Sequence, residues 1–292
     1  MTMHISADYF PCIDRGTGAP ILFVHGAACD HRIWVPHIQD LSQRHRCIAP
    51  TLRWFGRSQW PATTLEFSEK THAGDLATII EGLDCGPVFV VGWSYGANVA
   101  LRLSVDRPDL ITGVAAYEPS STSLVSEPLD IAMHQLSMQE TFFPVTEAAA
   151  AGDGTGVLKA FIGAVGGSGT FGKLPPDLRQ ICLDNAHTLI PLLSAKQRFA
   201  SVTAAELETL AMPVHVAWGE QSGDLWTIPS KAAARLTHVH GHAIHGADHI
   251  WPAKDPMAFL RWLDGVLHLG SKTEPVCPET LGLDVPIGSS TL

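Results

Sequence analysis

The pentapeptide GWSYG at 92–96 could place a reactive serine at the end of a strand. An apolar run precedes it at 87–91, and a helix-like segment follows it at 96–106. A sharp turn between a strand and a helix strains the serine backbone, so the residues two positions before and after it must be small. The N-terminus of the following helix also offers backbone N–H groups to a developing oxyanion. We therefore predict that Ser94 is a nucleophile.

A histidine that could activate this serine lies in HGADH at 245–249, between the last strand-like run and the last helix-like run. A general base must reach the serine from a loop at the same edge of the sheet. His249 fits by its order and position, whereas His245 lies nearer the end of the strand. We predict that His249 is the base.

The segment VHGA at 24–27 ends the first apolar run. In a parallel sheet its loop lies beside the turn that carries the nucleophile. The backbone N–H groups of Ala27 and Tyr95 are therefore the expected oxyanion donors. We expect the side chain of His25 to be buried and hydrogen-bonded, so that it shapes this loop rather than reacting.

The runs around these residues alternate between strand-like and helix-like. Such alternation is typical of a mostly parallel sheet with helices on both faces. The strands of such a sheet are buried on both sides and appear as continuous apolar runs. Strand-like runs cover 20–25, 46–50, 87–91, 111–117 and 213–218, and helix-like runs cover 31–43, 66–83, 96–106 and 255–268.

Residues 120–210 break this alternation, because they contain Gly-rich segments and helix-like pieces but no run typical of a buried strand. We predict that they form a helical cap over the C-terminal edge of the sheet. The core would then comprise 1–119 and 211–270. Residues 271–292 are rich in Ser, Thr, Pro and Gly, which predicts a loosely held tail. The helix-like pieces of the cap cover 128–150, 157–165, 176–199 and 203–210.

Four segments together resemble the α/β-hydrolase family over roughly residues 8–269. They are VHGA at 24–27, RWFGRS at 53–58, GWSYG at 92–96 and HGADH at 245–249. The resemblance implies a mostly parallel eight-stranded sheet with helices on both faces, an inserted helical cap and a triad of serine, histidine and an acid. Trp54 replaces a glycine that is usual in the second segment, which affects the expected shape of that loop.

The resemblance leaves two positions for the acid. Many members place an Asp three residues after the Gly that ends the penultimate strand. Here Gly219 is followed at that distance by Ser222, and Asp224 is near but displaced. Haloalkane dehalogenases and zearalenone lactonase instead place the acid after the strand that follows the nucleophile helix, which here corresponds to Glu118. We expect Glu118 and keep Asp224 as the alternative acid.

A serine at position 94 excludes the Asp-based dehalogenase and epoxide hydrolase routes. It predicts an acyl-enzyme route on a small, hydrophobic carboxylic ester or lactone. The alternatives are hydrolysis of a C–C bond in a β-diketone or dienoate, acyl transfer, and a non-catalytic ligand-binding protein of this fold. Aromatic side chains indicate an apolar, capped pocket. The candidate pocket residues are Trp34, Trp93, Phe142, Phe143 and Trp251.

The composition bounds the remaining function classes. Hydrophobic residues make up 46% and charged residues 16%, which is enough for a sizeable core. A formal net charge of −10 argues against nucleic-acid binding. The six cysteines form no CxxC pair, and no carboxylate completes a recognisable ligand set with the His-rich run, the histidines at 238, 240, 242, 245 and 249. We therefore expect no metal and no cofactor.

The start of the chain lacks the basic and apolar pattern of a signal peptide. No apolar run reaches the roughly 18 residues that a membrane helix needs. These features predict a cytoplasmic protein that does not enter a membrane. No pattern in the sequence predicts an oligomeric state.

Overall fold

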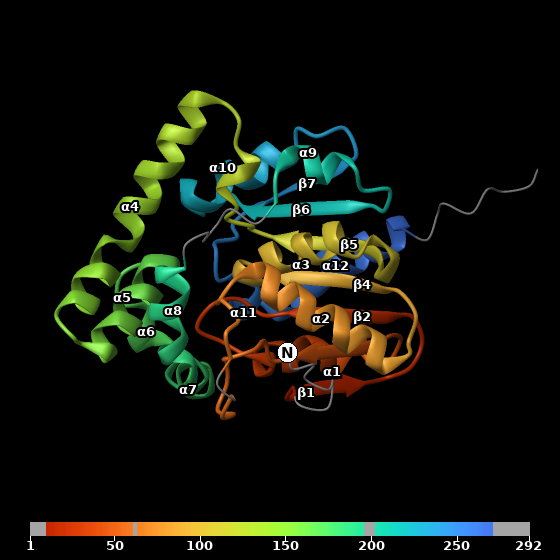
Figure 1. Cartoon of the computed structure of the whole chain (residues 1–292), viewed down its shortest axis with the longest axis horizontal. Coiled ribbons are helices and arrows are strands. Elements are labelled where there is room, and N and C mark those ends of the chain that lie inside the picture. Colours follow the sequence, from red (N-terminus) through yellow and green to blue (C-terminus); the bar gives the residue numbers. More distant parts are fainter. Residues whose placement is uncertain (1–9, 61–62, 196–201, 271–292) are drawn as a thin grey trace, which may run out of the picture.

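A seven-stranded sheet forms the centre of the computed structural model, which describes residues 10–60, 63–195 and 202–270 (Figure 1). The strand order is β1-β3-β2-β4-β5-β6-β7. Strand β1 pairs antiparallel with β3, and the neighbours from β3 to β7 are parallel. The strands are β1 (Cys12–Arg15), β2 (Pro20–Val24), β3 (Arg46–Pro50), β4 (Val88–Trp93), β5 (Ile111–Tyr117), β6 (Val214–Gly219) and β7 (Val239–Ile244).

The sheet contains seven strands within the described residues, where the family resemblance implies eight. Residues 1–9, which precede β1, lie outside the described residues. Strand β1 itself has no apolar run in the sequence, because its four residues, CIDR, lie at the exposed edge of the sheet. Edge pairing with β3 therefore produces a strand where the apolar pattern predicts none.

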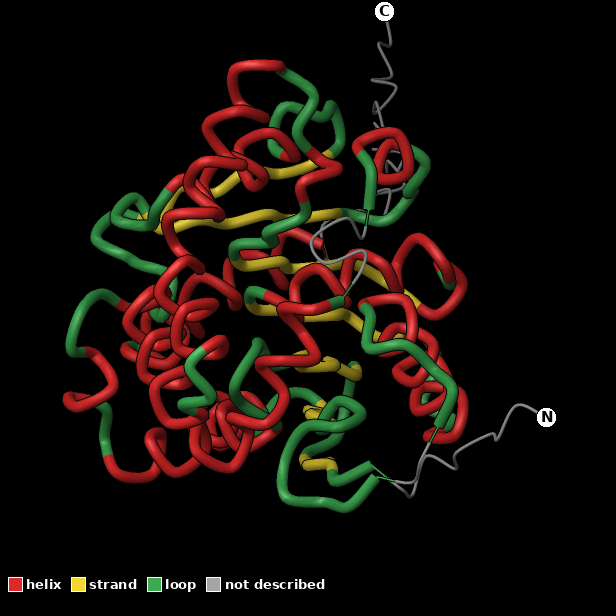
Figure 2. Tube along the Cα trace, turned by 60° about the vertical axis from the view of Figure 1, so that its left-hand side comes forward, coloured by secondary structure: helices red, strands yellow, loops and turns green. Residues whose placement is uncertain are grey.

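Helices cover both faces of the sheet, as the alternation predicts (Figures 1 and 2). The helix predicted at 31–43 begins as a 3-10 turn, His31–Trp34, because the Asp30 side chain caps it by accepting a hydrogen bond from Arg32 N. The α-helices are α1 (Val35–Leu41), α2 (Glu69–Leu83), α3 (Tyr95–Asp106), α4 (Pro128–Ala150), α5 (Gly154–Gly166), α6 (Thr170–Lys173), α7 (Pro176–Asn185), α8 (Leu189–Ser194), α9 (Ala204–Glu208), α10 (Asp224–Ala233), α11 (Trp251–Lys254) and α12 (Pro256–Gly270).

Strand β2 shows how one short apolar run serves both faces. Successive side chains of a strand point to opposite sides of the sheet. Leu22 and Val24 therefore enter the cluster beneath α2 and α3, whereas Ile21 and Phe23 enter the cluster beneath α1 and α12. All four are at most 1% exposed. Burial on both faces explains why the strand is a continuous apolar run.

Helices α4 to α8 gather at one end of the sheet, and we call them the cap helices (Figure 1). They share a hydrophobic cluster that includes Phe142, Leu158 and Leu189. Helix α9 contacts α3, and its Leu207 belongs to the cluster beneath α2 and α3. The division of the chain at 119/120 and 210/211 stays a prediction, and the predicted tail at 271–292 lies outside the described residues.

A polar network joins helix α7 to two core loops. Asn185 Nδ2 donates to Asp30 Oδ2 at 2.7 Å, and Asn185 Oδ1 accepts from Gly56 N at 2.6 Å. Asp184 accepts from Arg32 Nη2 at 2.8 Å and from Arg57 Nε at 2.7 Å. Asp30 is buried, which opposes its ionisation, but hydrogen bonds from Arg32 and Asn185 outweigh burial and lower the carboxyl pKa. The network fixes this end of the cap helices to the core.

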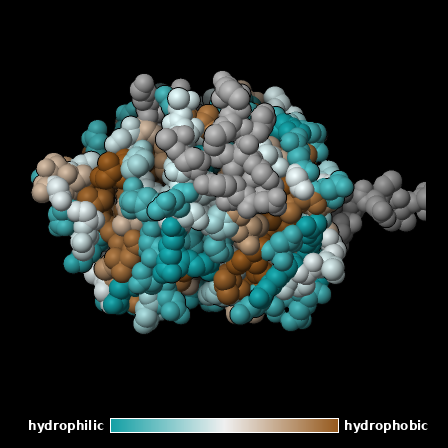
Figure 3. All heavy atoms as spheres, turned by 60° about the horizontal axis from the view of Figure 1, so that its bottom comes forward, coloured by the Kyte–Doolittle hydropathy of each residue, from teal (hydrophilic) through white to brown (hydrophobic). Residues whose placement is uncertain are grey.

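The surface seen in Figure 3 alternates between hydrophilic areas and separate hydrophobic patches. None of the helices in the described part of the chain is both long enough and apolar enough to cross a membrane.

Four of the buried histidines of this fold have a strongly lowered pKa. Desolvation lowers the pKa of His25 and of His215 to about 4, and that of His37 and of His72 to about 3. Each is at most 2% exposed. They are therefore neutral in the folded protein near neutral pH, whereas the unfolded chain binds protons at an ordinary histidine pKa of about 6.5.

These histidines predict a loss of stability in acid. Protons bind the unfolded state first, so the free energy of unfolding should fall as the pH drops from about 6.5 towards 4. Each histidine contributes up to about 1.4 kcal/mol per pH unit. His37 packs between Trp34 and Phe259, so a phenylalanine at position 37 should fit the same space. His37→Phe should reduce the slope of the free energy of unfolding against pH by up to this contribution of one histidine. Urea unfolding at about pH 7 and about pH 5 measures the slope.

Met257→Phe is the control, because Met257 is 49% exposed and carries no titratable group, so its substitution should leave the pH slope unchanged. An equal pH slope in wild type and His37→Phe would contradict the prediction.

Candidate active site

Ser94 lies in the tight turn between β4 and α3. Its φ of +58° is in the left-handed region, which is strained for a side chain other than glycine. A Cβ on Gly92 would lie 2.4 Å from Gly96 O, and a Cβ on Gly96 would lie 2.3 Å from Val24 O. The two glycines therefore allow the turn to pack against β2 and to present Ser94 to a cavity.

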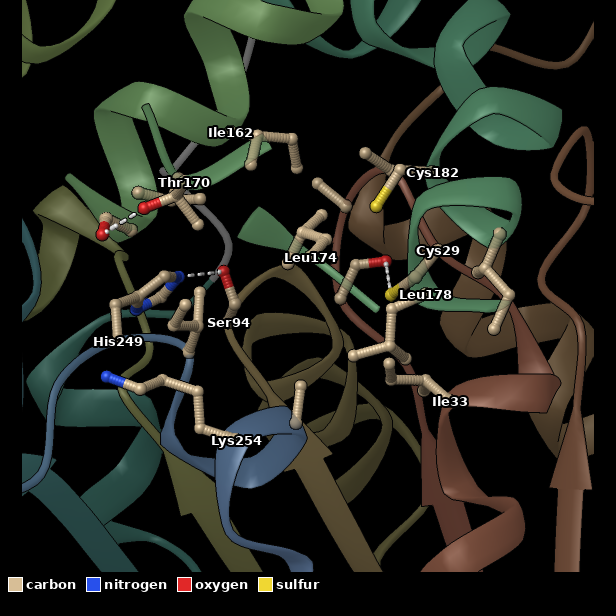
Figure 4. Close-up of a pocket in the computed structure, with 18 of the residues that line it drawn as sticks. Cys29, Ile33, Ser94, Ile162, Thr170, Leu174, Leu178, Cys182, His249 and Lys254 are labelled. Atoms are coloured by element: carbon tan, nitrogen blue, oxygen red, sulfur yellow. Dashed lines mark hydrogen bonds between the residues drawn. The ribbon is translucent and has the colours of Figure 1, made fainter. Parts of the chain in front are cut away.

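His249 connects Ser94 to a carboxylate. Its Nε2 lies 3.0 Å from Ser94 Oγ, and its Nδ1 lies 2.5 Å from Glu118 Oε2 (Figure 4 shows the first contact). A carboxylate oxygen accepts, so Nδ1 carries the proton and Nε2 is free to accept from the serine hydroxyl. His249 is 3% exposed and Glu118 is 0% exposed. The arrangement gives the serine a base that a buried acid orients.

The pairing of β4 with β5 explains why Glu118 is in reach. Trp93 pairs with Tyr117, so Ser94 and Glu118 are the next residues at two adjacent strand ends. Ser94 N donates to Tyr117 O at 2.9 Å, which holds the two ends together. Glu118 has a φ of +52°, and its Oε1 accepts from Gly219 N at 2.7 Å. The carboxylate is thus fixed by β6 on one side and bound to His249 on the other.

The residues next to the serine and the acid also hold the histidine loop. Trp93 Nε1 donates to His249 O at 2.8 Å, and Tyr117 Oη donates to Asp248 O at 2.7 Å. These bonds link three separate segments of the chain and limit the movement of His249.

The alternative acid is elsewhere. Asp224 is the first residue of α10, is exposed, and lies 3.5 Å from Thr227 Oγ1. The nearby Glu220 pairs with the exposed His245 at 2.8 Å. The structure therefore brings Ser94, His249 and Glu118 together and leaves Asp224 outside this group.

The expected oxyanion loop lies beside Ser94. A Cβ on Gly26 would lie 3.4 Å from Ser94 Cβ, and Ala27 lines the same cavity as the serine. His25 Nε2 accepts from Leu52 N at 3.0 Å, and its Nδ1 donates to Gly26 O at 2.9 Å. His25 is thus a buried residue that shapes the loop. The N–H groups of Ala27 and Tyr95 stay the predicted donors.

The side chain of Tyr95 is held by a hydrogen bond to His72. Its hydroxyl donates to His72 Nδ1 at 2.7 Å, and His72 Nε2 donates to Arg53 O at 3.2 Å. Desolvation lowers the pKa of His72 to about 3, so its Nδ1 is available as an acceptor near neutral pH. This contact fixes the first residue of α3 directly after the serine.

A cavity of about 460 Å³ opens between Ser94 and the cap helices (Figure 4). Its walls are mostly aliphatic, and Ser94, His249, Thr170 and Lys254 lie on the same side of the view in Figure 4. Lys254 at the edge pairs with Asp248 at 2.7 Å. Besides Ser94 and His249, the residues that bound it include Ala27, Cys29, Ile33, Trp93, Phe161, Ile162, Val165, Thr170, Leu174, Leu178, Ile181, Cys182, Ile250 and Lys254.

Of the predicted pocket residues, Trp93 lines the cavity. Trp34 and Trp251 lie in the core cluster beneath α1 and α12, and Phe142 lies inside the cap cluster. Phe143 is 63% exposed. Proximity in sequence to catalytic positions does not determine the face of a helix on which a side chain lies.

Sequence reasoning missed the aliphatic wall supplied by α5 and α7. Ile162 and Leu178 lie there, within segments whose helical spacing is visible in the sequence. The spacing gives the helix, but the inward face depends on how the cap helices pack over the sheet. Two thiols of the wall were also missed. Burial raises the pKa of Cys182 to about 11 and that of Cys29 further, so both stay protonated near neutral pH.

The His-rich run forms a small cluster with a strand partner. His215 Nδ1 lies 3.1 Å from His242 Nε2, and His240 stacks on His215 with centroids 4.7 Å apart. His238 instead donates from Nε2 to Leu207 O at 2.7 Å. Among the residues that the structure describes, no three His, Cys, Asp or Glu side chains are arranged to hold a metal ion.

The sequence profile of the alpha/beta hydrolase family matches residues 21–262. A segment of 110 residues is 31% identical to a haloalkane dehalogenase of Mesorhizobium japonicum, covering 36% of this chain and 34% of that protein. The chain thus spans about a third of the length of the curated relatives that it matches.

Two solved structures are similar over most of the chain. A thermophilic esterase from Thermogutta terrifontis has a TM-score of 0.69 at 22% identity, covering 89% of this chain and 93% of its own. An enol-lactonase from Burkholderia xenovorans LB400 has a TM-score of 0.71 at 16% identity, covering 89% and 96%. At these identities the similarity shows a shared fold.

Proposed function

This chain belongs to the alpha/beta hydrolase family, and from this premise we propose that it is a serine hydrolase acting on a hydrophobic carboxylic ester or lactone. One observation carries the proposal. Ser94, His249 and Glu118 form a continuous hydrogen-bonded series, and the serine and the histidine border an apolar cavity.

The proposed reaction proceeds through an acyl-enzyme. His249 Nε2 takes the proton of the Ser94 hydroxyl as Oγ attacks the acyl carbon. The N–H groups of Ala27 and Tyr95 stabilise the oxyanion, and Glu118 stabilises the imidazolium. The imidazolium then protonates the leaving alkoxide. Water, activated by His249, attacks the acyl-enzyme and releases the carboxylic acid.

The cavity supports the proposed substrate class. Its volume suits a small molecule, and its aliphatic walls favour an apolar body over a charged one. Its polar groups near the serine could orient a single carbonyl group.

We also propose that residues 120–210 act as a cap. Apolar side chains from this stretch line the cavity, so they would exclude water and select the substrate by shape. They include Phe161, Ile162, Leu174 and Leu178.

Turnover of p-nitrophenyl esters and lactones with product analysis tests the function. We expect multiple turnovers. Each ester should release one carboxylic acid and p-nitrophenol, each lactone should open to one hydroxy acid, and the carboxyl group should carry an oxygen from labelled water. Transfer of the acyl group to an added alcohol instead of water would indicate an acyltransferase. A single turnover would indicate a ligand-binding protein. Cleavage of β-diketones or dienoates without ester cleavage would indicate a C–C hydrolase.

Narrowing the cavity should change the preferred chain length. Leu178→Trp places a larger ring in the wall and should displace several methylene groups of a long acyl chain. At about 0.8 kcal/mol per buried methylene, kcat/KM for a long-chain p-nitrophenyl ester should fall roughly 10- to 100-fold. The value for p-nitrophenyl acetate should change far less. Steady-state kinetics on a series of chain lengths measures both.

Leu183→Trp is the matched control, because Leu183 lies on the same helix and is 45% exposed. It should leave the chain-length series unchanged. Equal effects of Leu178→Trp on short and long esters would mean that the acyl chain does not occupy this cavity.

A further inference from the structure

The indole of Trp226 lies flat on the imidazole of His249. The ring centroids are 3.9 Å apart and the planes differ by 19°. Both residues are nearly buried, with 6% and 3% of their surfaces exposed. The other tryptophan near His249, Trp93, is 6.2 Å away at 51°, so it contacts the histidine less directly. Trp226 therefore covers one face of the imidazole.

Trp226 is held firmly in this place. It lies in the first turn of α10, and its side chain belongs to the cap cluster with Phe142 and Phe161. Helix α10 packs against both α4 and β6. The indole thus sits between the histidine and the cap helices. The segment after β6 supplies this ring, while the acid comes from the end of β5.

We propose that Trp226 is a positioning residue for His249, a role that rests on the proposed function. Trp226 fixes the plane of the imidazole and stabilises the imidazolium that forms during the reaction.

The hydrogen bonds of His249 leave one rotation of the imidazole ring open, and the stack with Trp226 restricts this rotation. Glu118 holds Nδ1 and Ser94 contacts Nε2, and both contacts lie near the ring plane. The ring can still rock about the line that joins its two nitrogens. An indole at 3.9 Å blocks this motion on one side.

The same contact responds to charge. The face of an indole carries a negative quadrupole, so it attracts a cation stacked on it more strongly than a neutral ring. Proton transfer from Ser94 converts His249 to a cation, and the attraction then appears in the transition state rather than in the resting enzyme. An interaction of this kind raises kcat.

Trp226 is not among the described residues that bound the cavity, so it should act on kcat and not on substrate binding. Trp226→Leu removes the aromatic face, and kcat should fall roughly 3- to 30-fold, with KM changed less than about twofold. Trp226→Phe keeps an aromatic face and should recover much of the loss. A rise in KM at constant kcat, or equal losses in both variants, would overturn the proposal.

Trp262→Phe is the matched control. Trp262 also contacts a histidine, His242, but edge-on at 76° and outside the site. It should leave kcat near the wild-type value. A loss as large as that of Trp226→Leu would mean that any half-buried tryptophan in contact with a histidine has this effect, which would overturn the proposal.

A spectroscopic test separates this inference from the proposed function, because it needs no turnover. The Cε1 proton of His249, assigned by its absence in His249→Gln, should be shifted upfield by the ring current of the indole. The shift should disappear in Trp226→Leu and persist in Trp262→Phe. An unshifted resonance in the wild type would overturn the stack even if the protein is active. A shifted resonance in an inactive protein would overturn the function and leave the stack in place.

Discussion

Ser94→Ala is expected to lower kcat by about 10⁴- to 10⁶-fold, because serine, histidine and acid act as a unit and the loss of one removes covalent catalysis. The effect should appear in kcat rather than in KM, since the cavity walls that bind the substrate stay unchanged. Alanine removes one hydroxyl and keeps the Cβ, so the turn with its φ of +58° should keep its shape.

Steady-state kinetics and covalent labelling measure this result together. A fluorophosphonate probe should add to Ser94 and to no other residue of the wild-type protein, as mass spectrometry of the digest would show. Ser104→Ala is the control, because Ser104 is a buried serine of α3 whose hydroxyl bonds to Ala100 O. Near-normal turnover of Ser94→Ala, or an adduct at another residue, would reject Ser94 as the nucleophile.

Glu118→Gln should lower kcat by about 10³- to 10⁴-fold. A triad acid fixes the tautomer of the histidine and stabilises the imidazolium, and an amide does neither, because its NH₂ can donate to Nδ1 and reverse the tautomer. The change keeps the size of a side chain that is fully buried, and the amide oxygen can still accept from Gly219 N. Stability should therefore fall much less than activity. Kinetics combined with thermal unfolding separates the two.

Asp224→Asn is the matched comparison, since it neutralises the other carboxylate considered for this role. Asp224 is exposed and contacts Thr227 rather than His249, so its loss should cost less than about tenfold. A larger loss of kcat in Asp224→Asn than in Glu118→Gln would assign the acid to the segment after β6. Wild-type kcat in both variants would mean that Ser94 and His249 act without an acid.

Motifs that depend on local geometry could be predicted from the sequence. GWSYG requires a turn that only small neighbours of the serine permit. In the structure, a Cβ on either glycine would clash with a backbone oxygen. The alternating burial of β2 and the helices on both faces likewise follow from apolar patterning.

Features that depend on packing between distant segments were harder to predict. The choice between Glu118 and Asp224 depends on β5 lying next to β4. The family resemblance implies this order, and the spacing from Ser94 to Glu118 allows it without establishing it. Most of the predicted aromatic pocket residues lie elsewhere, because tertiary contacts decide whether a side chain of the core or of a cap helix faces the cavity. The contact of Trp226 with His249 joins helix α10 to the loop after β7, and no local sequence pattern predicts it.

The network around Asp184 and Asn185 makes the two ends of the cap helices unequal. Helix α7 is tied by charged and amide groups to the loops that hold Asp30 and Gly56. Helix α5 is instead held by apolar contacts, which have little directional preference. For protein engineering, α7 is therefore the part of the cap helices to keep, and α5 is the part to vary. Libraries aimed at new substrates belong at Ile162 and Val165 of α5, which line the cavity. Variation at Asn185 would remove hydrogen bonds that hold α7 to the loops of Asp30 and Gly56.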